Sequence, residues 1–315
     1  MRIVLPGALP DPVEARELTK HLASSAPTLL GWLQHARARI ISAEPTQSGC
    51  TPYELWQLLD HGFQTTADQN LAAGLGPLWT SGPTEPDQPV WLVELVHVSP
   101  SRDGAALLPA SELQISLEHS VALFESVQDL FSEAGFHLTP SSTHHWRITL
   151  PDGYMPRCCS PALVSITSVN DWWPQDMASR PWRRLVNEVQ MLWFEHPVNQ
   201  ARYKQGLIPI NSLWLFGGAH SNQLVHRAES TSTQVHHNLH EFSIKHDWGG
   251  WLTALAHLEQ QVFVPLAKQS GSMPDLVLTG SNRIIELKQA PALSRWARFL
   301  PGNRNTWSHW WSPQN

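Results

Sequence analysis

The sequence predicts an α/β protein in which mixed sheet layers are flanked by helices, arranged as one lobe or two. Between Val90 and Leu150 a strand pattern is followed by an amphipathic segment and then by two more strand patterns. A long helical pattern from about Gly249 to Lys268 precedes two short apolar runs, LVLTG and RIIELK, joined by a Ser281-Asn282 turn. The content of 42% hydrophobic residues, with 16 Trp, supplies enough apolar area for a sizeable core.

The first part of the chain is expected to hold one strand and two helices. The run from Arg2 to Leu5 is typical of a short buried strand. Apolar residues then recur at helical spacing from Val13 to Ile41, and Pro27 interrupts the pattern, so this segment predicts two consecutive helices.

A third helix is predicted from the signals at its start. Thr51 precedes Pro52 and lies three residues before Glu54, which is the arrangement of a capping box, and the helix should run to about Leu59. The Pro- and Gly-rich stretch from Gly74 to Pro89 is expected to be a long surface loop that serves as a linker or flap.

The middle of the chain alternates between strand and helix patterns. VWLVELVHV, from Val90, predicts a strand, and Ser111 to Ala134 predicts a helical segment that ends at Gly135. FHLTPSSTHHWRITL predicts a hairpin. The stretch 151–181 is rich in loop signals, and one strand is expected there at Ala162 to Ser168.

The second half should begin with a helix from about Trp182 to Glu195, followed by a short helix and a strand from Ile208 to Phe216. These patterns suggest an N-terminal α/β lobe at 1–150, a loop-rich connection at 151–181 and a C-terminal α/β lobe at 182–315.

The composition limits the classes of partner. The net charge of −6 and the pI of about 6.3 exclude nucleic acid as the main partner, because phosphate contacts need clustered Lys and Arg. No run approaches eighteen apolar residues and the opening MRIVLPGALPDP does not resemble a signal peptide, so we expect no membrane partner and a cytoplasmic location.

No cofactor is predicted, since neither a P-loop nor a GxGxxG pattern follows a strand. The three cysteines, Cys50, Cys158 and Cys159, have no metal-ligand spacing and are expected to be buried and inert, although a vicinal pair can also sense redox state.

The densest pattern of polar, Gly and Pro residues lies between Asn187 and Gly218. Pro197 ends or kinks the preceding helix and makes His196 a cap for the next one. Asn199 and Arg202 lie three apart on that short helix and can point together, and Asn211 gives the following strand a polar start.

This run resembles the RpfE-type regulatory proteins of bacteria, in which N-E-x-Q-M-L precedes H-P-V-N-x-x-R, a Gly and P-x-N-S-x-W. Weaker likeness extends to the helix start at Thr51, the aromatic strand near Trp91 to His97 and a Trp/Arg segment at Arg295 to Arg304. The shorter pattern H-P-x-N-x-x-R-x-x-x-G-x-x-P-x-N also resembles a segment of archaeal-type cofactor-independent phosphoglycerate mutases.

The resemblance implies a non-catalytic regulatory or binding protein that is a degenerate relative of phosphoglycerate mutase. Those mutases use a Ser or Thr nucleophile and Asp and His ligands for two metal ions, whereas Leu5-Pro6-Gly7-Ala8 follows the first strand here. Whether the chain is an enzyme is left open, with no catalytic residue assigned. The alternative is a metal-dependent phosphoglycerate mutase-like phosphotransferase or phosphatase.

A small anionic ligand is the binding hypothesis for the motif. A guanidinium at Arg202 held between the carboxamides of Asn199 and Asn211, with His196 beside them, would suit a carboxylate or phosphate. In the competing interpretation Arg202 pairs with Glu188 or Glu195 or binds helix carbonyls, and both Asn side chains bond to the backbone.

Two histidine clusters are further candidates for chemistry. His236, His237 and His240 have a spacing that metal sites use but lack the Glu of HExxH, so solvated loop histidines are favoured and no metal site is assigned. His144 and His145 are likewise expected on the surface.

The last cluster is aromatic. Trp307, Trp310 and Trp311 lie in a polar tail with few apolar neighbours, and they are the candidates for docking a protein partner. Trp248 and Trp251, by contrast, are expected in the core of the long helix.

Overall fold

The computed structural model describes residues 1–102, 104–225, 232–270, 272–289 and 307–311. It divides the chain into two compact units: unit 1 combines Met1–Glu44 with Ala228–Asn315, and unit 2 is Pro45–Arg227. None of the helices in this described part combines the length and apolar character that crossing a bilayer requires. The Arg295 to Arg304 segment lies outside the described residues.

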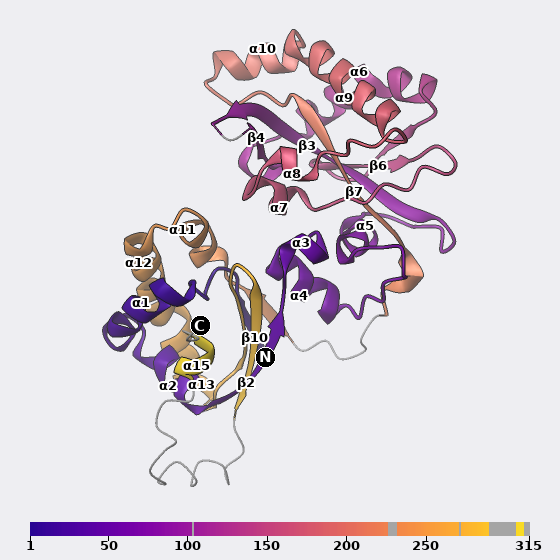
Figure 1. Ribbon diagram of the computed structural model, residues 1–315. Coiled ribbons are helices and arrows are strands. Elements are labelled where there is room, and N and C mark those ends of the chain that lie inside the picture. The colour runs from indigo at the N-terminus through magenta and orange to yellow at the C-terminus, as the bar shows by residue number, and fades with distance from the viewer. Residues whose placement is uncertain (103, 226–231, 271, 290–306, 312–315) are drawn as a thin grey trace. The chain divides into compact units, whose positions relative to one another are not determined.

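Unit 1 is built on a five-stranded mixed sheet in the order β2-β10-β9-β1-β8. Strands β2 and β10 of this sheet are labelled in Figure 1. Strand β1 pairs in parallel with β8 and β9, whereas β10 pairs antiparallel with both β9 and β2. The strands are β1 (Arg2–Leu5), β2 (Ala36–Ser42), β8 (Thr233–Val235), β9 (Asp275–Thr279) and β10 (Arg283–Gln289).

Helices cover one face of this sheet, where Ile3, Leu5, Leu276 and Leu278 belong to one apolar core. Trp251 and other helical side chains fill the same core. The helical elements are α1 (Pro12–Ser25), α2 (Pro27–His35), η4 (His237–Leu239), α11 (His240–Ile244), α12 (Trp248–Leu258), the π-turn η5 (Glu259–Phe263), α13 (Val264–Ser270) and α15 (Ser308–Trp311).

The unit boundaries differ from the lobes suggested by the sequence at 150 and 182. Residues 1–44 join the last part of the chain because β1 lies between β8 and β9 and because β2 pairs with β10. The division into two units depends on strands that pair across more than half the length of the chain. Local sequence patterns do not predict such distant pairing.

Unit 2 is built on an antiparallel sheet in which the long strand β3 (Pro89–Ser101) is central. Its first part pairs with β6 (His145–Thr149) and with β7 (Ser212–His220), and its last part pairs with β4 (Gly104–Leu108). β5 (His137–Pro140) continues the sheet beyond β6, which confirms the predicted hairpin. An α/β protein with two sheets and flanking helices is therefore confirmed.

The helices of unit 2 pack on both faces of its sheet. α6 (Leu117–Glu133) and α9 (Arg180–Phe194) share a core with β3 and β7, and α7 (Pro161–Ser165) and α8 (Val169–Trp172) share another with β3 and β4. The remaining helical elements are α3 (Pro45–Ser48), α4 (Pro52–Asp60), η1 (Leu71–Gly74), α5 (Leu75–Trp79), η2 (Ala110–Glu112), α10 (Pro197–Lys204) and η3 (Ser221–Gln223).

The capping box of α4 is confirmed and also joins two helices. Thr51 Oγ1 accepts from the amide of Glu54, and Glu54 Oε2 accepts from the Thr51 amide at 2.7 Å. The same oxygen accepts from Ser160 Oγ at 2.6 Å, and Ser160 is the N-cap of α7. Burial raises the pKa of Glu54 to about 7.

Three predicted elements were wrong. Residues Ala36–Ser42 form a strand, because their short alternating pattern pairs with β10. The strand expected at Ala162 to Ser168 is the short helix α7, which Ser160 and Pro161 initiate. Within the expected loop from Gly74 to Pro89, Leu75–Trp79 is helical and contacts β7.

Strand β7 begins four residues later than predicted and continues through the glycine pair. Gly217 and Gly218 have φ of 100° and 109°, and Gly218 is the extra residue of a β-bulge opposite Val90 and Trp91. A Cβ at Gly217 would lie 2.6 Å from the Val90 carbonyl oxygen, so a glycine is needed for the close approach of the two backbones.

Candidate functional site

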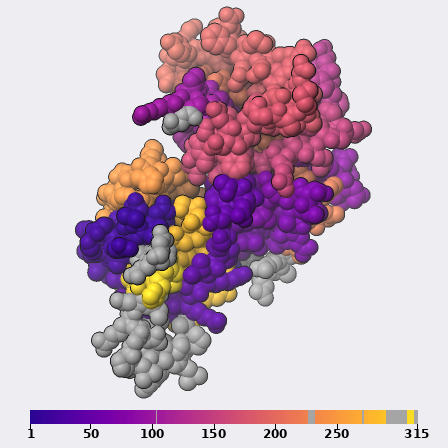
Figure 2. All heavy atoms as spheres, viewed as in Figure 1, coloured from indigo at the N-terminus to yellow at the C-terminus, as the bar shows by residue number. Residues whose placement is uncertain are grey.

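The candidate site is a surface hollow of about 720 Å³ in unit 2, between the end of β3 and the helices α9 and α10, here called the α9–α10 groove. These helices form part of the visible surface of unit 2 (Figure 2). The groove is lined by His97, Val98, Ser99, Pro100, Gln190, Trp193, Phe194, Asn199, Gln200, Tyr203, Lys204, Pro209 and Asn211. Its volume falls in the range of small-molecule sites.

The predicted cap between α9 and α10 is confirmed. His196 Nδ1 accepts from the amide of Val198 at 3.2 Å, and Gly206 ends the segment in the left-handed region with φ 71°. Burial lowers the pKa of His196, which favours the neutral ring that this contact requires.

Two carboxamides hold the walls of the groove together. Asn199 Nδ2 donates to the carbonyl oxygens of Trp193 and Ile210, at 2.8 and 2.7 Å, and its Oδ1 accepts from the Ile210 amide. Asn211 Oδ1 accepts from the amide of Val98 and Asn211 Nδ2 donates to the carbonyl of Val98, both at 2.8 Å. Both carboxamides therefore form these hydrogen bonds with backbone groups.

Arg202 does not lie between the two carboxamides, so the expected planar donor set is corrected. The side chain is 1% exposed, and its Nε donates to the carbonyl of Ile208 at 2.9 Å. Its two terminal nitrogens donate to the carbonyls of Leu113, Gln114 and Ile208. The guanidinium fastens α10 to the start of α6, and anion binding by this motif stays a prediction that this geometry does not support.

His119 completes the contacts of Arg202. Its Nδ1 accepts from an Arg202 terminal nitrogen at 3.1 Å and from the Ser116 amide at 3.4 Å. Burial and the nearby guanidinium both lower the pKa of His119, so the ring is held neutral with Nδ1 as an acceptor.

The rim of the groove is aromatic and exposed. Phe194 is 81% exposed and Tyr203 is 82% exposed. Lys204 adds one cation to the lining, and His97 Nδ1 donates to the carbonyl of Pro209 at 2.9 Å. Such a surface can stack on an apolar or aromatic ligand and place one positive charge beside it.

The C-terminal tryptophans are not an exposed docking surface. Trp307, Trp310 and Trp311 are 7%, 8% and 1% exposed and belong to the core of unit 1. Trp311 Nε1 donates to the carbonyl of Ala15 at 3.2 Å. The polar residues next to the three tryptophans in the sequence favoured an exposed tail. Their apolar neighbours in the fold come instead from α1 and the sheet, which are distant in the sequence.

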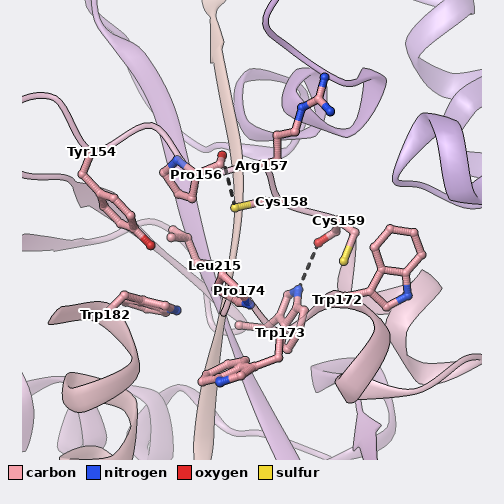
Figure 3. A pocket seen from close by; sticks show the side chains of 11 residues that line it. Tyr154, Pro156, Arg157, Cys158, Cys159, Trp172, Trp173, Pro174, Trp182 and Leu215 are labelled. Carbon is pink, nitrogen blue, oxygen red and sulfur yellow. Dashed lines mark hydrogen bonds between the residues drawn. The ribbon is translucent and has the colours of Figure 1, made fainter. Parts of the chain in front are cut away.

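The cysteines of unit 2 are all reduced, and burial raises the pKa of each thiol. Cys158 and Cys159 line a cavity of about 20 Å³ with Trp173 and Trp182 (Figure 3). That space holds about one water molecule. The geometry favours the buried and inert interpretation over redox sensing.

The histidine clusters have different environments. Among the residues that the structure describes, no group of three or more His, Cys, Asp or Glu is placed to hold a metal ion. Trp251 lies in the core of unit 1, as expected, and the partly buried Trp248 packs against that core. His145, expected on the surface, instead contacts the buried Glu94 at 2.9 Å. Glu94 and His145 are 51 positions apart, so no local sequence pattern predicts their contact.

No family model matches the chain. The chain is 25% identical over 126 residues to a probable 2,3-bisphosphoglycerate-independent phosphoglycerate mutase of Geobacter sulfurreducens, a match that covers 40% of this chain and 32% of that protein. Part of the chain is thus distantly related to cofactor-independent phosphoglycerate mutases. The match spans about a third of that relative, and membership of the RpfE-type family stays a prediction.

Two solved structures are similar over most of their length. The PH0037 protein of Pyrococcus horikoshii has 12% identity and a TM-score of 0.48, with 91% of this chain and 86% of that chain covered. The cofactor-independent phosphoglycerate mutase of Thermoplasma acidophilum DSM 1728 has 12% identity and a TM-score of 0.34, with 91% and 89% covered.

Proposed function

We propose that this chain is a non-catalytic binding protein of regulatory type, and that the α9–α10 groove is its binding site. Its ligand has an apolar or aromatic body and an anionic group. The observation that carries the proposal is the pair of rim aromatics, Phe194 and Tyr203, each more than 80% exposed beside the groove. Exposed aromatic area of this kind is costly in water and is typical of binding surfaces.

The charge of the groove supports the anionic part of the proposal. Lys204 supplies one cation to the lining of the groove. Asn199 and Asn211 act as supports, because all their contacts above are with the backbone of the walls. Their role is to hold Trp193 and Val98 in place around the ligand.

The packing at the parallel strand ends of unit 1 is consistent with a non-catalytic protein. Ligands of open α/β sheets bind outside the carboxyl ends of the strands. Beyond β1 and β9 the chain's own backbone fills this position: the Leu9 amide donates to the Thr279 carbonyl at 3.1 Å, and Trp251 Nε1 donates to the Gly7 carbonyl at 2.9 Å. A Cβ at Gly7 would lie 2.8 Å from the Cα of His240.

The groove is tested with the fluorescent probe 8-anilinonaphthalene-1-sulfonate, which combines aromatic rings with an anion. We expect wild-type protein to bind the probe and the double variant Phe194→Ser/Tyr203→Ser to bind it about thirtyfold more weakly, because two exposed stacking surfaces of about 1 kcal/mol each are lost. The measurement is a fluorescence titration on folded protein. Val13→Ser removes a side chain that is 73% exposed on α1 and serves as the matched control.

Unchanged affinity in the double variant would exclude the groove as the site. Equal weakening in Val13→Ser would show that the probe binds exposed apolar residues in general. Both substitutions are at exposed positions, where stability should change by less than about 0.5 kcal/mol.

A metal-dependent phosphoglycerate mutase-like activity is the second candidate, and the 25% identity to the Geobacter protein favours it. We expect purified protein supplied with Mn²⁺ or Zn²⁺ not to interconvert 3- and 2-phosphoglycerate, because Pro6, Gly7 and Ala8 follow β1 in place of ligand side chains. A coupled enolase assay measures the reaction. Turnover that a chelator abolishes would establish the second candidate instead.

A further inference from the structure

The turn between β5 and β6 places a serine hydroxyl against a histidine ring. Ser142 Oγ accepts from the amides of His144 and His145, at 3.3 and 3.0 Å. The same oxygen lies 3.5 Å from Nδ1 of His145. With two amides directed at Oγ, its own hydrogen is the one available for the imidazole nitrogen.

The imidazole of His145 is oriented by a buried carboxylate. His145 Nε2 lies 2.9 Å from Glu94 Oε2, and the other oxygen of Glu94 accepts from the amide of Ala110 at 2.8 Å. Glu94 is 6% exposed. Because a carboxylate accepts hydrogen bonds, Nε2 carries the proton and Nδ1 is left as the acceptor that faces Ser142.

Aromatic packing fixes the ring plane. Trp79 stacks on His145 with ring centroids 6.0 Å apart and planes 23° apart, and Phe216 meets the ring edge at 5.6 Å. Ser142 and His145 are both partly exposed, so a reagent from solvent can reach the hydroxyl. The three groups have the connectivity of an activated nucleophile, its base and a group that orients the base.

We propose that Ser142 is a nucleophile that accepts acyl groups from small activated esters, with His145 as its base and Glu94 as the positioning residue. Ser142 Oγ bonds to the carbonyl carbon of the ester while its proton moves to His145 Nδ1. The bond between that carbon and the leaving oxygen then breaks, and the proton passes from Nδ1 to the leaving alcohol. The site is separate from the α9–α10 groove. The step ends at the acyl-serine without turnover, so it modifies the protein once and leaves the proposed non-catalytic role unchanged.

The neighbouring serine provides a matched control inside the same protein. Ser141 is also partly exposed in the same turn, but its Oγ accepts from the amide of Ser81 at 3.1 Å. The two serines therefore differ in the imidazole contact and share solvent access. Any difference in their reactivity reports on His145.

The test is labelling by a fluorophosphonate, followed by peptide mapping to measure the rate at each serine. In that reaction Oγ bonds to phosphorus, fluoride leaves, and the proton is taken up by His145. We expect Ser142 to react at least about 100-fold faster than Ser141, in the range that a positioned base contributes. His145→Gln and Glu94→Gln should bring Ser142 down to the rate of Ser141.

Equal rates at the two serines in wild-type protein, or no labelling at Ser142, would overturn the proposal. That comparison needs no variant, so it decides the question even if Glu94→Gln unfolds. Fast labelling of Ser142 that persists in folded His145→Gln would also overturn it, since the imidazole would then have no part in the reaction.

Discussion

Replacing Trp311 with Ala should lower the free energy of unfolding of unit 1 by about 3–5 kcal/mol, the usual cost of removing a buried tryptophan. Trp311 is 1% exposed in the core, and its indole nitrogen donates to Ala15 of α1. The substitution leaves a cavity and removes one hydrogen bond to the carbonyl of Ala15, which still accepts from Thr19 Oγ1. Denaturant unfolding of the full chain measures the effect.

His309→Ala is the control, because His309 is exposed on the same short helix α15. It should change the free energy of unfolding by less than about 0.5 kcal/mol. If Trp311→Ala is as stable as His309→Ala, the tail does not belong to the core, and docking of a partner through its tryptophans regains its support.

Replacing Arg202 with Lys should lower the free energy of unfolding of unit 2 by about 2–4 kcal/mol, although the charge is kept. The guanidinium donates to the carbonyls of Leu113, Gln114 and Ile208, which an ammonium group cannot reach together. Each buried carbonyl left unpaired costs about 1–3 kcal/mol. Arg184→Lys, at a side chain 82% exposed, is the control and should be nearly neutral.

Wild-type protein and the Arg202→Lys variant also test whether the motif binds an anion. Melting curves with and without millimolar phosphate or 3-phosphoglycerate should coincide for wild type, because the donors of Arg202 already bind carbonyl oxygens. A phosphate-dependent rise in wild type that Arg202→Lys abolishes would contradict this and would place an anion at the guanidinium.

The elements that the sequence predicts well are those whose signals are local. The capping box at Thr51, the cap at His196 and the turn at Ser281-Asn282 each depend on residues within a few positions of one another. The strand Ala36–Ser42 was missed because its pairing partner β10 lies about 240 residues away. An alternation of only a few residues is too short to distinguish a strand from the continuation of a helix.

Prediction of the candidate site from the sequence is limited in the same way, because its contacts join residues that are distant in the chain. Asn199, Arg202 and Asn211 were found from their spacing, but their partners are backbone groups, and spacing does not reveal which atoms a side chain will meet. Phe194 and Tyr203 carry the proposed binding, yet an exposed aromatic and a buried one look alike in sequence. Burial is a property of the whole fold.

The insertion of unit 2 into unit 1 sets an order of events during synthesis. Strand β1 leaves the ribosome early, but its partner β8 follows about 230 residues later. At the usual rate of translation that interval is on the order of 10–50 s. Unit 2 is continuous in sequence and can fold within that interval. During the same interval β1 and the apolar faces of α1 and α2 lack the partners that the later part of unit 1 supplies. Residues 1–44 therefore expose apolar surface until the strands β8, β9 and β10 have been made.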